Sequence, residues 1–337
     1  MSSMFLNELL SQTPAAVNTL DGLTGPSIQR PRFGSVGAAA SLDFDDPYDN
    51  LYAFGKIWAG YDEPQVGGFH GMMYGRIGDA RMIPLFGYTG TGVMQSKIDD
   101  DGNMWIRGKE TGYFTDLATG DILETWDNPW TGETVEVFNF YNDNMGGKLT
   151  AQMPRFAMGA AKDDATLMND GTHQEQAGVV PFLLPFDNFG DNLLLAWDYA
   201  HEYTNPVTQD KWPKAHTGER ISPSEHFTFD MSLAQMMDRS QASCRYMAGF
   251  SRVSQWWPWM HMGEHEHKDE VLFGRMFSHK GLPDFGDVPP KVLTYIEKNA
   301  PEYLEVPDHW PEVMPKGTWE AYAEEVSPEI QAASGEH

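Results

Sequence analysis

Two turns of the form Thr-Gly-acid constrain the fold of this chain more than any other feature. Thr119-Gly120-Asp121 and Thr131-Gly132-Glu133 each place a glycine where a hairpin needs a positive φ angle. A segment centred on Trp126 lies between the two turns. Residues 113–143 therefore predict three adjacent antiparallel strands joined by polar turns, which is a β-meander.

Short runs of aromatic and β-branched residues continue this pattern along the chain. They cover 69–77, 81–88, 92–98, 104–113, 179–186, 193–199, 225–229, 245–253 and 270–277. A flat open sheet of so many strands would expose long edges that pair with other chains. We therefore expect a mainly β fold with α additions, in which an antiparallel meander curls into a barrel-like domain with peripheral helices.

Helical signals are concentrated at two places. Asp46 is a side-chain N-cap ahead of Pro47, and apolar residues then recur at helical spacing as far as Trp58. A second helix opens at Pro289-Pro290 and ends before Pro301. These positions predict one helix before the strands and one after them.

Composition divides the chain into three parts. Residues 1–40 are predicted to form an N-terminal arm, because 13–40 is rich in Gly, Pro, Ala and Ser. Residues 41–304 are expected to form a single β-barrel-like domain, with long mouth loops within 145–178, and 305–337 a C-terminal extension. The arm is compatible with a homodimer in which it crosses a neighbouring subunit, and equally with a frayed terminus.

The charge balance excludes two classes of partner. The chain carries 49 acidic against 23 basic residues, a formal net charge of −26, and has no cluster of Lys and Arg. Such a surface does not release counterions from a phosphate backbone, so we expect no nucleic acid and no anionic membrane as partner. Cys244 is the only cysteine, which rules out an intrachain disulfide. The N-terminal sequence lacks a signal-peptide pattern and no apolar run is long enough to span a membrane, so a cytoplasmic location is expected.

One predicted strand carries a row of polar side chains suited to proton transfer. His70, Tyr74 and Arg76 alternate along 69–77 and therefore share one face. A His-Tyr-Arg row that faces an interior can exchange protons with an oxygenated substrate. The alternative is that these are structural polar residues with satisfied hydrogen bonds.

A second strand offers a cation and a phenol. Trp105, Arg107 and Tyr113 share one face of the run 104–113, and Arg107 with Tyr113 would orient a carbonyl or carboxylate if that face looks inward. If it looks outward, these are ordinary solvent-exposed side chains. His226 is a further candidate for catalysis, although a histidine that alternates with a buried phenylalanine face is commonly at the surface.

Aromatic turns supply candidate ligand-binding residues. Trp126, Asn128 and Trp130 belong to one turn and Trp259 to a later loop, and their rings could stack on an aromatic ligand at a barrel rim. The alternative is a Trp-Pro packing cluster that fixes the turn, and the two interpretations are compatible.

Nothing in the motifs predicts a cofactor. The chain has no phosphate-binding loop, dinucleotide Gly-x-Gly-x-x-Gly motif or nucleophile elbow. His265 and His267 alternate in a strand-like spacing that could hold a metal, but they lie among charged residues typical of a solvated loop. We therefore expect no cofactor and no metal, and keep a metal-dependent enzyme as the least favoured alternative.

Four stretches resemble one known family, domain of unknown function 1838, which is mostly bacterial. They are the Trp126-Asp-Asn-Pro turn with its Thr-Gly-Glu hairpin, Leu42-Asp-Phe-Asp-Asp-Pro47, Ser224-Glu-His-Phe-Thr-Phe229 and Trp257-Pro-Trp-Met-His-Met-Gly263. The resemblance covers residues 42 to 280 approximately, and departs where the chain has Glu264 in place of an expected glycine. It implies a family but no reaction.

The leading functional hypothesis is a cofactor-independent enzyme, an isomerase, dehydratase or other lyase. It would act by proton transfer on a small oxygenated hydrophobic compound, aromatic or terpenoid, inside the cavity of the β-domain. The second hypothesis is a non-catalytic binding protein for a small hydrophobic ligand, which would use the same cavity.

Overall fold

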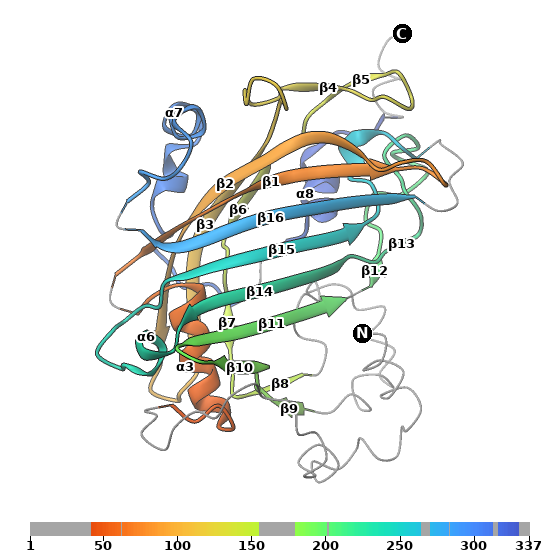
Figure 1. Cartoon of the computed structure of the whole chain (residues 1–337). Coiled ribbons are helices and arrows are strands. Elements are labelled where there is room, and N and C mark those ends of the chain that lie inside the picture. Colours follow the sequence, from red (N-terminus) through yellow and green to blue (C-terminus); the bar gives the residue numbers. More distant parts are fainter. Residues whose placement is uncertain are drawn as a thin grey trace, which may run out of the picture.

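One antiparallel sheet dominates the computed structural model (Figure 1), which describes residues 42–61, 63–154, 179–200, 202–263, 270–282, 284–312 and 316–329. The long strands, in sheet order, are β11 (Asn192–Ala200), β14 (Ser224–Ser232), β15 (Tyr246–Ser254), β16 (Val271–Leu282), β1 (Gln65–Arg76), β2 (Ile83–Ile98) and β3 (Met104–Thr115). At one edge β10 (Phe186–Phe189) pairs with β11, and at the other β6 (Phe140–Asp143) and β7 (Lys148–Leu149) pair with β3.

The sheet curls but stays open. No described strand joins β10 to β6 or β7, so a mainly β fold with a large antiparallel sheet is confirmed and the predicted closure into a barrel is not found. Exposed edges were the reason to expect closure. The edge strands are instead very short, with four residues in β10 and in β6 and two in β7, which limits pairing with other chains.

An antiparallel meander is present over the first of the predicted runs, from 69 to 113. β1, β2 and β3 are antiparallel neighbours, but the runs 81–88 and 92–98 form the single strand β2 because the intervening residues remain paired with both neighbours. Gly120 and Gly132 have φ angles of 70° and 72°, which confirms both turns. The strand of Trp126 is β4 (Thr125–Asp127), and it pairs with β5 (Thr134–Glu136) in a hairpin separate from the main sheet, so the meander is interrupted.

Both helices expected from the sequence are confirmed as α3 (Pro47–Trp58) and α7 (Pro290–Asn299). Asp46 caps α3, because its side chain accepts a hydrogen bond from the backbone N–H of Tyr48 at 2.7 Å. The remaining elements are β8 (Gln152–Pro154), β9 (Val179–Pro181), β12 (Tyr203–Thr204), β13 (Arg220–Ile221), α6 (Leu233–Met237), η1 (Pro258–Met260), η2 (Pro301–Leu304) and α8 (Thr318–Glu325).

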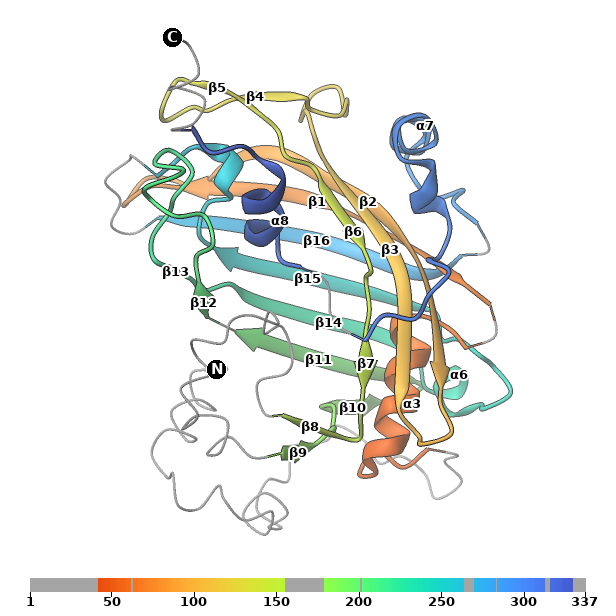
Figure 2. The ribbon, with the colours of Figure 1, turned by 180° about the vertical axis from the view of Figure 1, so that it is seen from behind.

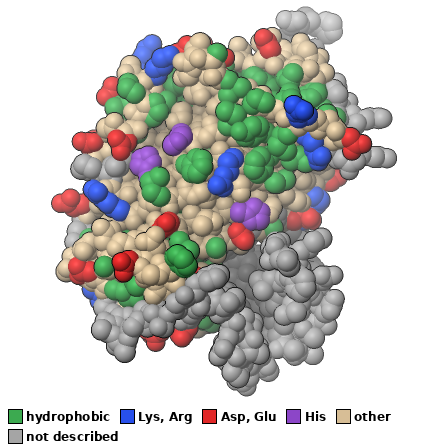
Figure 3. Space-filling model, in the orientation of Figure 1, with side chains coloured by type: hydrophobic (Ala, Val, Ile, Leu, Met, Phe, Trp, Pro, Cys, Tyr) green, Lys and Arg blue, Asp and Glu red, His purple; other side chains and the backbone are tan. Residues whose placement is uncertain are grey.

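Helices α3 and α8 lie on the concave side of the sheet, which faces the viewer in Figure 2. Trp319 of α8 is fully buried in a cluster that includes Trp256, Trp257 and Trp259. The other face is convex, and Figure 3 shows hydrophobic side chains gathered on it. Phe277 of β16 is among the exposed hydrophobic residues. The helices α3 and α8 thus enclose an interior on the concave side, while α7 packs over Tyr113 of β3.

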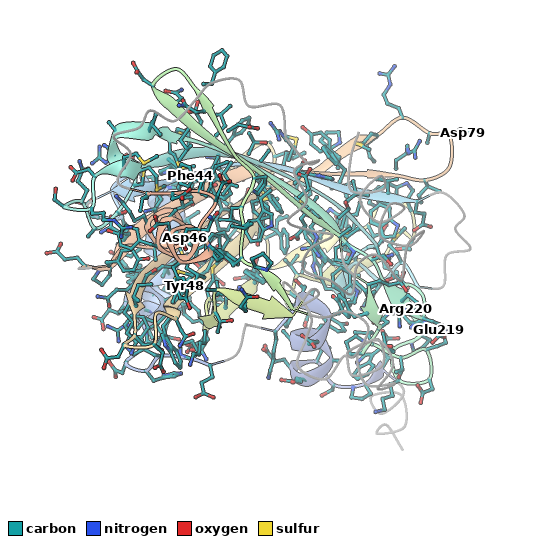
Figure 4. The ribbon with its side chains drawn as sticks, turned by 90° about the horizontal axis from the view of Figure 1, so that it is seen from below. Phe44, Asp46, Tyr48, Asp79, Glu219 and Arg220 are labelled. Carbon is teal, nitrogen blue, oxygen red and sulfur yellow. The ribbon has the colours of Figure 1, made fainter. Side chains whose placement is uncertain are left out.

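Figure 4 looks along the molecule from below and separates its two ends. Phe44, Asp46 and Tyr48 lie beside α3 at one end, and Glu219 and Arg220, at the start of β13, lie at the other. The predicted arm at 1–40 and most of the predicted mouth loops, at 155–178, fall outside the described residues. Among the described helices, none combines the length and the apolar character that crossing a membrane would require.

Candidate functional site

A cavity of about 400 Å³ lies between the concave face and the elements that cover it. Strands β1, β2, β3, β14, β15 and β16 form its floor, and α3, β6 and the start of α8 contribute walls. This volume is in the range typical of small-molecule sites. The cavity is therefore the candidate site that the fold itself creates.

Glycines open the floor of the cavity. Gly67, Gly68 and Gly92 line it from β1 and β2, where any side chain would fill part of the space. Gly112 of β3 has a related role, because a Cβ atom there would collide with the phenol oxygen of Tyr88. The absence of side chains at these positions gives the remaining polar groups access to the interior.

Glu110 of β3 is the most strongly perturbed acid of the cavity. It pairs across the sheet with Asn142 of β6, and both side chains line the cavity. Burial raises the pKa of the Glu110 carboxyl to about 7, the hydrogen bond from Asn142 opposes this, and the charge of Glu225 adds to it. At neutral pH this carboxyl is therefore present in both protonation states.

The charged groups of the cavity affect the pKa of the Tyr88 phenol on β2. Burial is the main cause that raises the pKa of its phenol; Glu110 and Glu225 raise it further, and Arg252 lowers it. Its ring packs against Phe114 at 5.0 Å and Phe69 at 5.2 Å between centroids. The phenol is thus held in place and remains a hydrogen-bond donor at physiological pH.

An ion pair forms the facing wall. Arg252 Nη1 of β15 lies 3.2 Å from Glu225 Oε1 of β14, and the two side chains are 18% and 10% exposed. The guanidinium also lies 5.6 Å from the ring centroid of Trp319. Within the described part of the chain, Arg252 Nε is buried without a hydrogen-bond partner. That nitrogen is an unused donor in the wall of the cavity.

The rest of the cavity wall is largely aromatic. Phe54 and Trp58 of α3 pack with ring centroids 5.6 Å apart, and Trp197 of β11 lies 6.3 Å from Trp58 and 5.8 Å from Phe227. All four line the cavity. An apolar, ring-sized part of a ligand fits such a wall, while its oxygen reaches the polar groups.

A family model described as "Protein of unknown function (DUF1838)" matches residues 64–326. The chain belongs to the DUF1838 family. This confirms the resemblance seen in the sequence. The matched segment runs from just before β1 to the end of α8, so every described cavity-lining residue except Phe54 and Trp58 lies within it. The cavity is therefore built almost entirely from the family region.

Comparison with other proteins adds no function to this DUF1838 chain. No curated protein matches it. Among solved structures it is similar to a triple mutant of the Rhodopseudomonas blastica porin, with 10% identity over 65% of this chain and 99% of that one and a TM-score of 0.16. Aeromonas veronii immune modulator A has 8% identity over 67% and 98% of the two chains and a TM-score of 0.12. Scores this low do not establish a shared fold.

In this DUF1838 chain His70, Tyr74 and Arg76 share one face of β1, as predicted, but that face is the convex one. His70 is exposed and its ring lies 6.2 Å from that of Phe277. The alternate residues of the strand, Phe69 among them, line the cavity instead. The structure brings the three polar side chains together on the outer face, so their catalytic role stays a prediction that their position does not support.

Arg107 and Tyr113 share the outer face of β3 with Trp105, where later segments cover them. Arg107 Nη1 donates to the carbonyl of Pro307 at 2.9 Å, and its guanidinium lies 4.7 Å from the Trp310 ring centroid. Tyr113 is fully buried beneath α7. Trp105 Nε1 donates to Asp99 at 2.8 Å. The predicted inward orientation of this face differs from the structure, because the C-terminal part of the chain packs on it.

His226 lies on the convex face in a serine-histidine-aspartate row. Its Nδ1 is 3.1 Å from Asp198 Oδ1 and its Nε2 is 3.2 Å from Ser224 Oγ. Ser224, His226 and Asp198 contact one another in the order of a catalytic triad. Strand β14, however, is hydrogen-bonded along this stretch to both of its neighbours, β11 and β15. Its backbone N–H groups therefore do not form an oxyanion hole here. The row stabilises the outer face, and the predicted catalytic role of His226 is not supported by its position.

The tryptophan turn forms a packing cluster, one of the two alternatives that the sequence allowed. Asn128 Nδ2 donates to the carbonyl of Met260 at 2.8 Å, and its Oδ1 accepts from the N–H of Trp130 at 2.9 Å. The rings of Trp126 and Trp259 lie 5.8 Å apart in the core. These four residues tie the β4–β5 hairpin to the loop after β15. In this region it is Trp257 that lines the cavity.

The described residues contain no group of three or more His, Cys, Asp or Glu side chains that could hold a metal ion. His265 and His267 fall in 264–269, outside the described residues. The residues that do line the cavity and that sequence reasoning missed are Tyr88, Glu110, Asn142, Glu225 and Arg252. A signal for one of them was present: Glu110 alternates with Gly108 and Gly112, and glycines on one face of a strand mark the face with open space.

Proposed function

We propose that this DUF1838 protein is a cofactor-independent enzyme that transfers a proton within a small, hydrophobic, oxygenated substrate held in the cavity. The reaction class is isomerisation, dehydration or a related elimination. One observation carries the proposal: a carboxyl whose pKa burial raises to about 7, Glu110, faces an aromatic cavity opposite the Glu225–Arg252 pair.

Glu110 suits the role of proton carrier. A group with a pKa near the working pH accepts a proton in one step and returns it in the next. Two carboxyl groups line the cavity, Glu110 with a raised pKa and Glu225 in an ion pair with Arg252, and different environments of this kind can separate acid and base roles.

Tyr88 and Arg252 suit the role of polarising the substrate oxygen. Both carry hydrogen-bond donors, and Arg252 retains a buried N–H without a described partner. Removing a proton from carbon beside a carbonyl places negative charge on the oxygen, and fixed donors in an apolar site stabilise that charge. The aromatic wall formed by Phe54, Trp58, Trp197 and Phe227 would hold the hydrophobic part of the same molecule.

A binding protein is the second candidate, and the extent of the aromatic wall favours it. Such a protein needs the cavity but no proton transfer, so loss of the Glu110 carboxyl would leave binding intact. The two candidates therefore differ in one measurable step, the movement of a proton between ligand and solvent.

The experiment is solvent exchange in D₂O with a panel of neutral aryl ketones and enones that carry acidic C–H bonds, followed by proton nuclear magnetic resonance. The protein should accelerate loss of the C–H signal or migration of the double bond. Glu110→Gln should reduce this rate by about 100-fold or more, since one carboxyl carries the proton. Glu136→Gln, an exposed acid on β5, is the matched control and should leave the rate unchanged.

A result in which the compounds bind saturably but no proton exchanges would replace the enzyme by the binding protein. Exchange that is equally fast in Glu110→Gln would retain an enzyme but refute Glu110 as its proton carrier.

A further inference from the structure

We propose that the cavity selects uncharged carbonyl compounds over carboxylates of the same shape, and that Glu110 is the residue that enforces the selection. The inference concerns the site of the proposed function and names its substrate class. It requires binding in the cavity but no turnover.

The charges already present leave no place for a ligand carboxylate. Arg252 lines the cavity, and Glu225 already lies 3.2 Å from its Nη1. Lys316 at the rim pairs with Glu324. An added carboxylate would therefore join three acids that already line the cavity, Glu110, Glu225 and Glu320, in a space where burial weakens solvent screening.

The hydrogen-bonding groups, by contrast, suit one neutral oxygen. The Tyr88 phenol and the Arg252 Nε–H are donors, and each is held by packing against the Phe114 or the Trp319 ring. A carbonyl oxygen has two lone pairs and accepts from both. It adds no charge that opposes Glu110. A ketone thus obtains the same hydrogen bonds as a carboxylate without the repulsion.

The selection depends on pH through the charge of Glu110. The groups that line the same cavity as this carboxyl include Tyr88 of β2, Asn142 of β6, Tyr203 of β12, Glu225 of β14, Arg252 and Tyr246 of β15, His279 of β16, and Lys316 and Glu320 at the start of α8. Burial raises the pKa of Tyr88 and Tyr246, which therefore stay neutral near pH 7, and lowers the pKa of His279, so the charge change of this histidine moves to lower pH and away from that of Glu110. Protonation of Glu110 removes one negative charge, so a carboxylate should bind better at low pH.

The test compares 2-acetylnaphthalene with 2-naphthoate, which have the same ring and differ in one charge, by equilibrium dialysis. At pH 8 the ketone should bind at least about tenfold more tightly, and at pH 6 the naphthoate should gain about fivefold. Glu110→Gln should bind naphthoate about tenfold more tightly than the wild type at pH 8 and lose the pH dependence. Glu136→Gln removes the same charge from the surface and should behave as the wild type.

Equal or tighter binding of naphthoate at pH 8, an unchanged preference in Glu110→Gln, or no saturable binding of the ketone would each overturn the inference. Failure of the proposed function looks different. In that case the ketone binds with the predicted preference, but its methyl protons do not exchange with D₂O faster in the presence of the protein.

Discussion

Buried charges occur in two regions of this protein, and the two regions treat them in opposite ways. Beside α3, each of two buried lysines uses all three of its donors. Lys56 Nζ donates to the carbonyls of Gln235, Met236 and Asp238 at 2.7, 3.1 and 2.8 Å, and Lys280 Nζ donates to those of Lys56 and Ala59 and to Ser243 Oγ at 2.9, 2.6 and 2.6 Å. In both cases the ammonium binds carbonyls at the end of a helix, where these acceptors lack helical partners.

In the cavity the polar groups are only partly satisfied. Glu110 has Asn142 as its hydrogen-bonding neighbour, and Arg252 has one carboxylate and a buried Nε without a described partner. Burial lowers the pKa of Lys280 to about 7, so its ammonium is tolerated only because every hydrogen bond is made, whereas the cavity groups keep hydrogen-bonding capacity that the described residues do not use. The number of unused donors and acceptors thus distinguishes the two lysines, whose hydrogen bonds hold the structure together, from the polar residues of the cavity.

The largest effect on stability should come from replacing one of the two fully hydrogen-bonded lysines. Lys280→Met leaves two carbonyls and a hydroxyl without their donor, so we expect the free energy of unfolding to fall by about 3 kcal/mol. Urea denaturation measures this. Lys291→Met is the control, because that exposed lysine also hydrogen-bonds to Asp121 and should cost less than about 1 kcal/mol. Equal losses in both variants would erase the distinction between the two regions.

Glu110→Gln should change stability in the opposite direction. The folded pKa of about 7 lies above the ordinary value of 4.5, so the folded state binds more protons than the unfolded state between these values. The stability of the wild type therefore falls as pH rises through this window. The variant lacks the titration, so it should be more stable than the wild type by about 2 kcal/mol at pH 8 and nearly equal to it at pH 4. A stability difference between variant and wild type that does not vary with pH would show that burial does not raise the pKa of Glu110.

Tyr88→Phe isolates a single donor of the cavity. The ring and its stacking are retained, so we expect the melting temperature to stay within about 2 °C of the wild type. Binding of a neutral ketone should weaken about tenfold, or 1.4 kcal/mol. Calorimetric titration provides the measurement. If binding is unchanged, the phenol does not contact the ligand oxygen and the donor must be sought in Arg252.

The smallest effect is expected at His226, one residue from Glu225 but on the opposite face. His226→Ala removes contacts with Asp198 and Ser224 on the convex side. Ketone binding in the cavity should change by less than about twofold, while Glu225→Gln should weaken it about tenfold by releasing Arg252. The pair of variants tests which face of β14 carries the site. Equal effects would return His226 to the list of site residues.

Much of the fold follows from local signals. The turns at Gly120 and Gly132 and the N-cap at Asp46 require particular backbone conformations or hydrogen bonds, and all three are present as predicted. Closure of the sheet has no such local signal. It depends on how two edges meet after the sheet has curled, which neither edge sequence specifies.

The site was harder to predict because alternation defines the faces of a strand but not which face is inside. On β3 the aromatic and cationic residues Trp105, Arg107 and Tyr113 share a face that resembles a cavity wall, yet the C-terminal segments cover it. Glu110, alone among glycines, resembles a solvent residue. Only the curvature of the sheet and the packing of α7 and α8 decide between the faces, and both involve contacts distant in sequence.

The pairing of β1 with β16 has a consequence for how the protein is made. Val66 pairs with Leu282, so β1, the first strand of the sheet along the chain, cannot complete its pairing until β16, the last strand, has been synthesised. Until β16 leaves the ribosome, β1 and β15 each present an unpaired edge to whatever else is in solution. Arrival of β16 joins the two half-sheets, and α8 follows. The cavity is therefore completed late in synthesis, and a delay before that point leaves two strand edges unpaired at once.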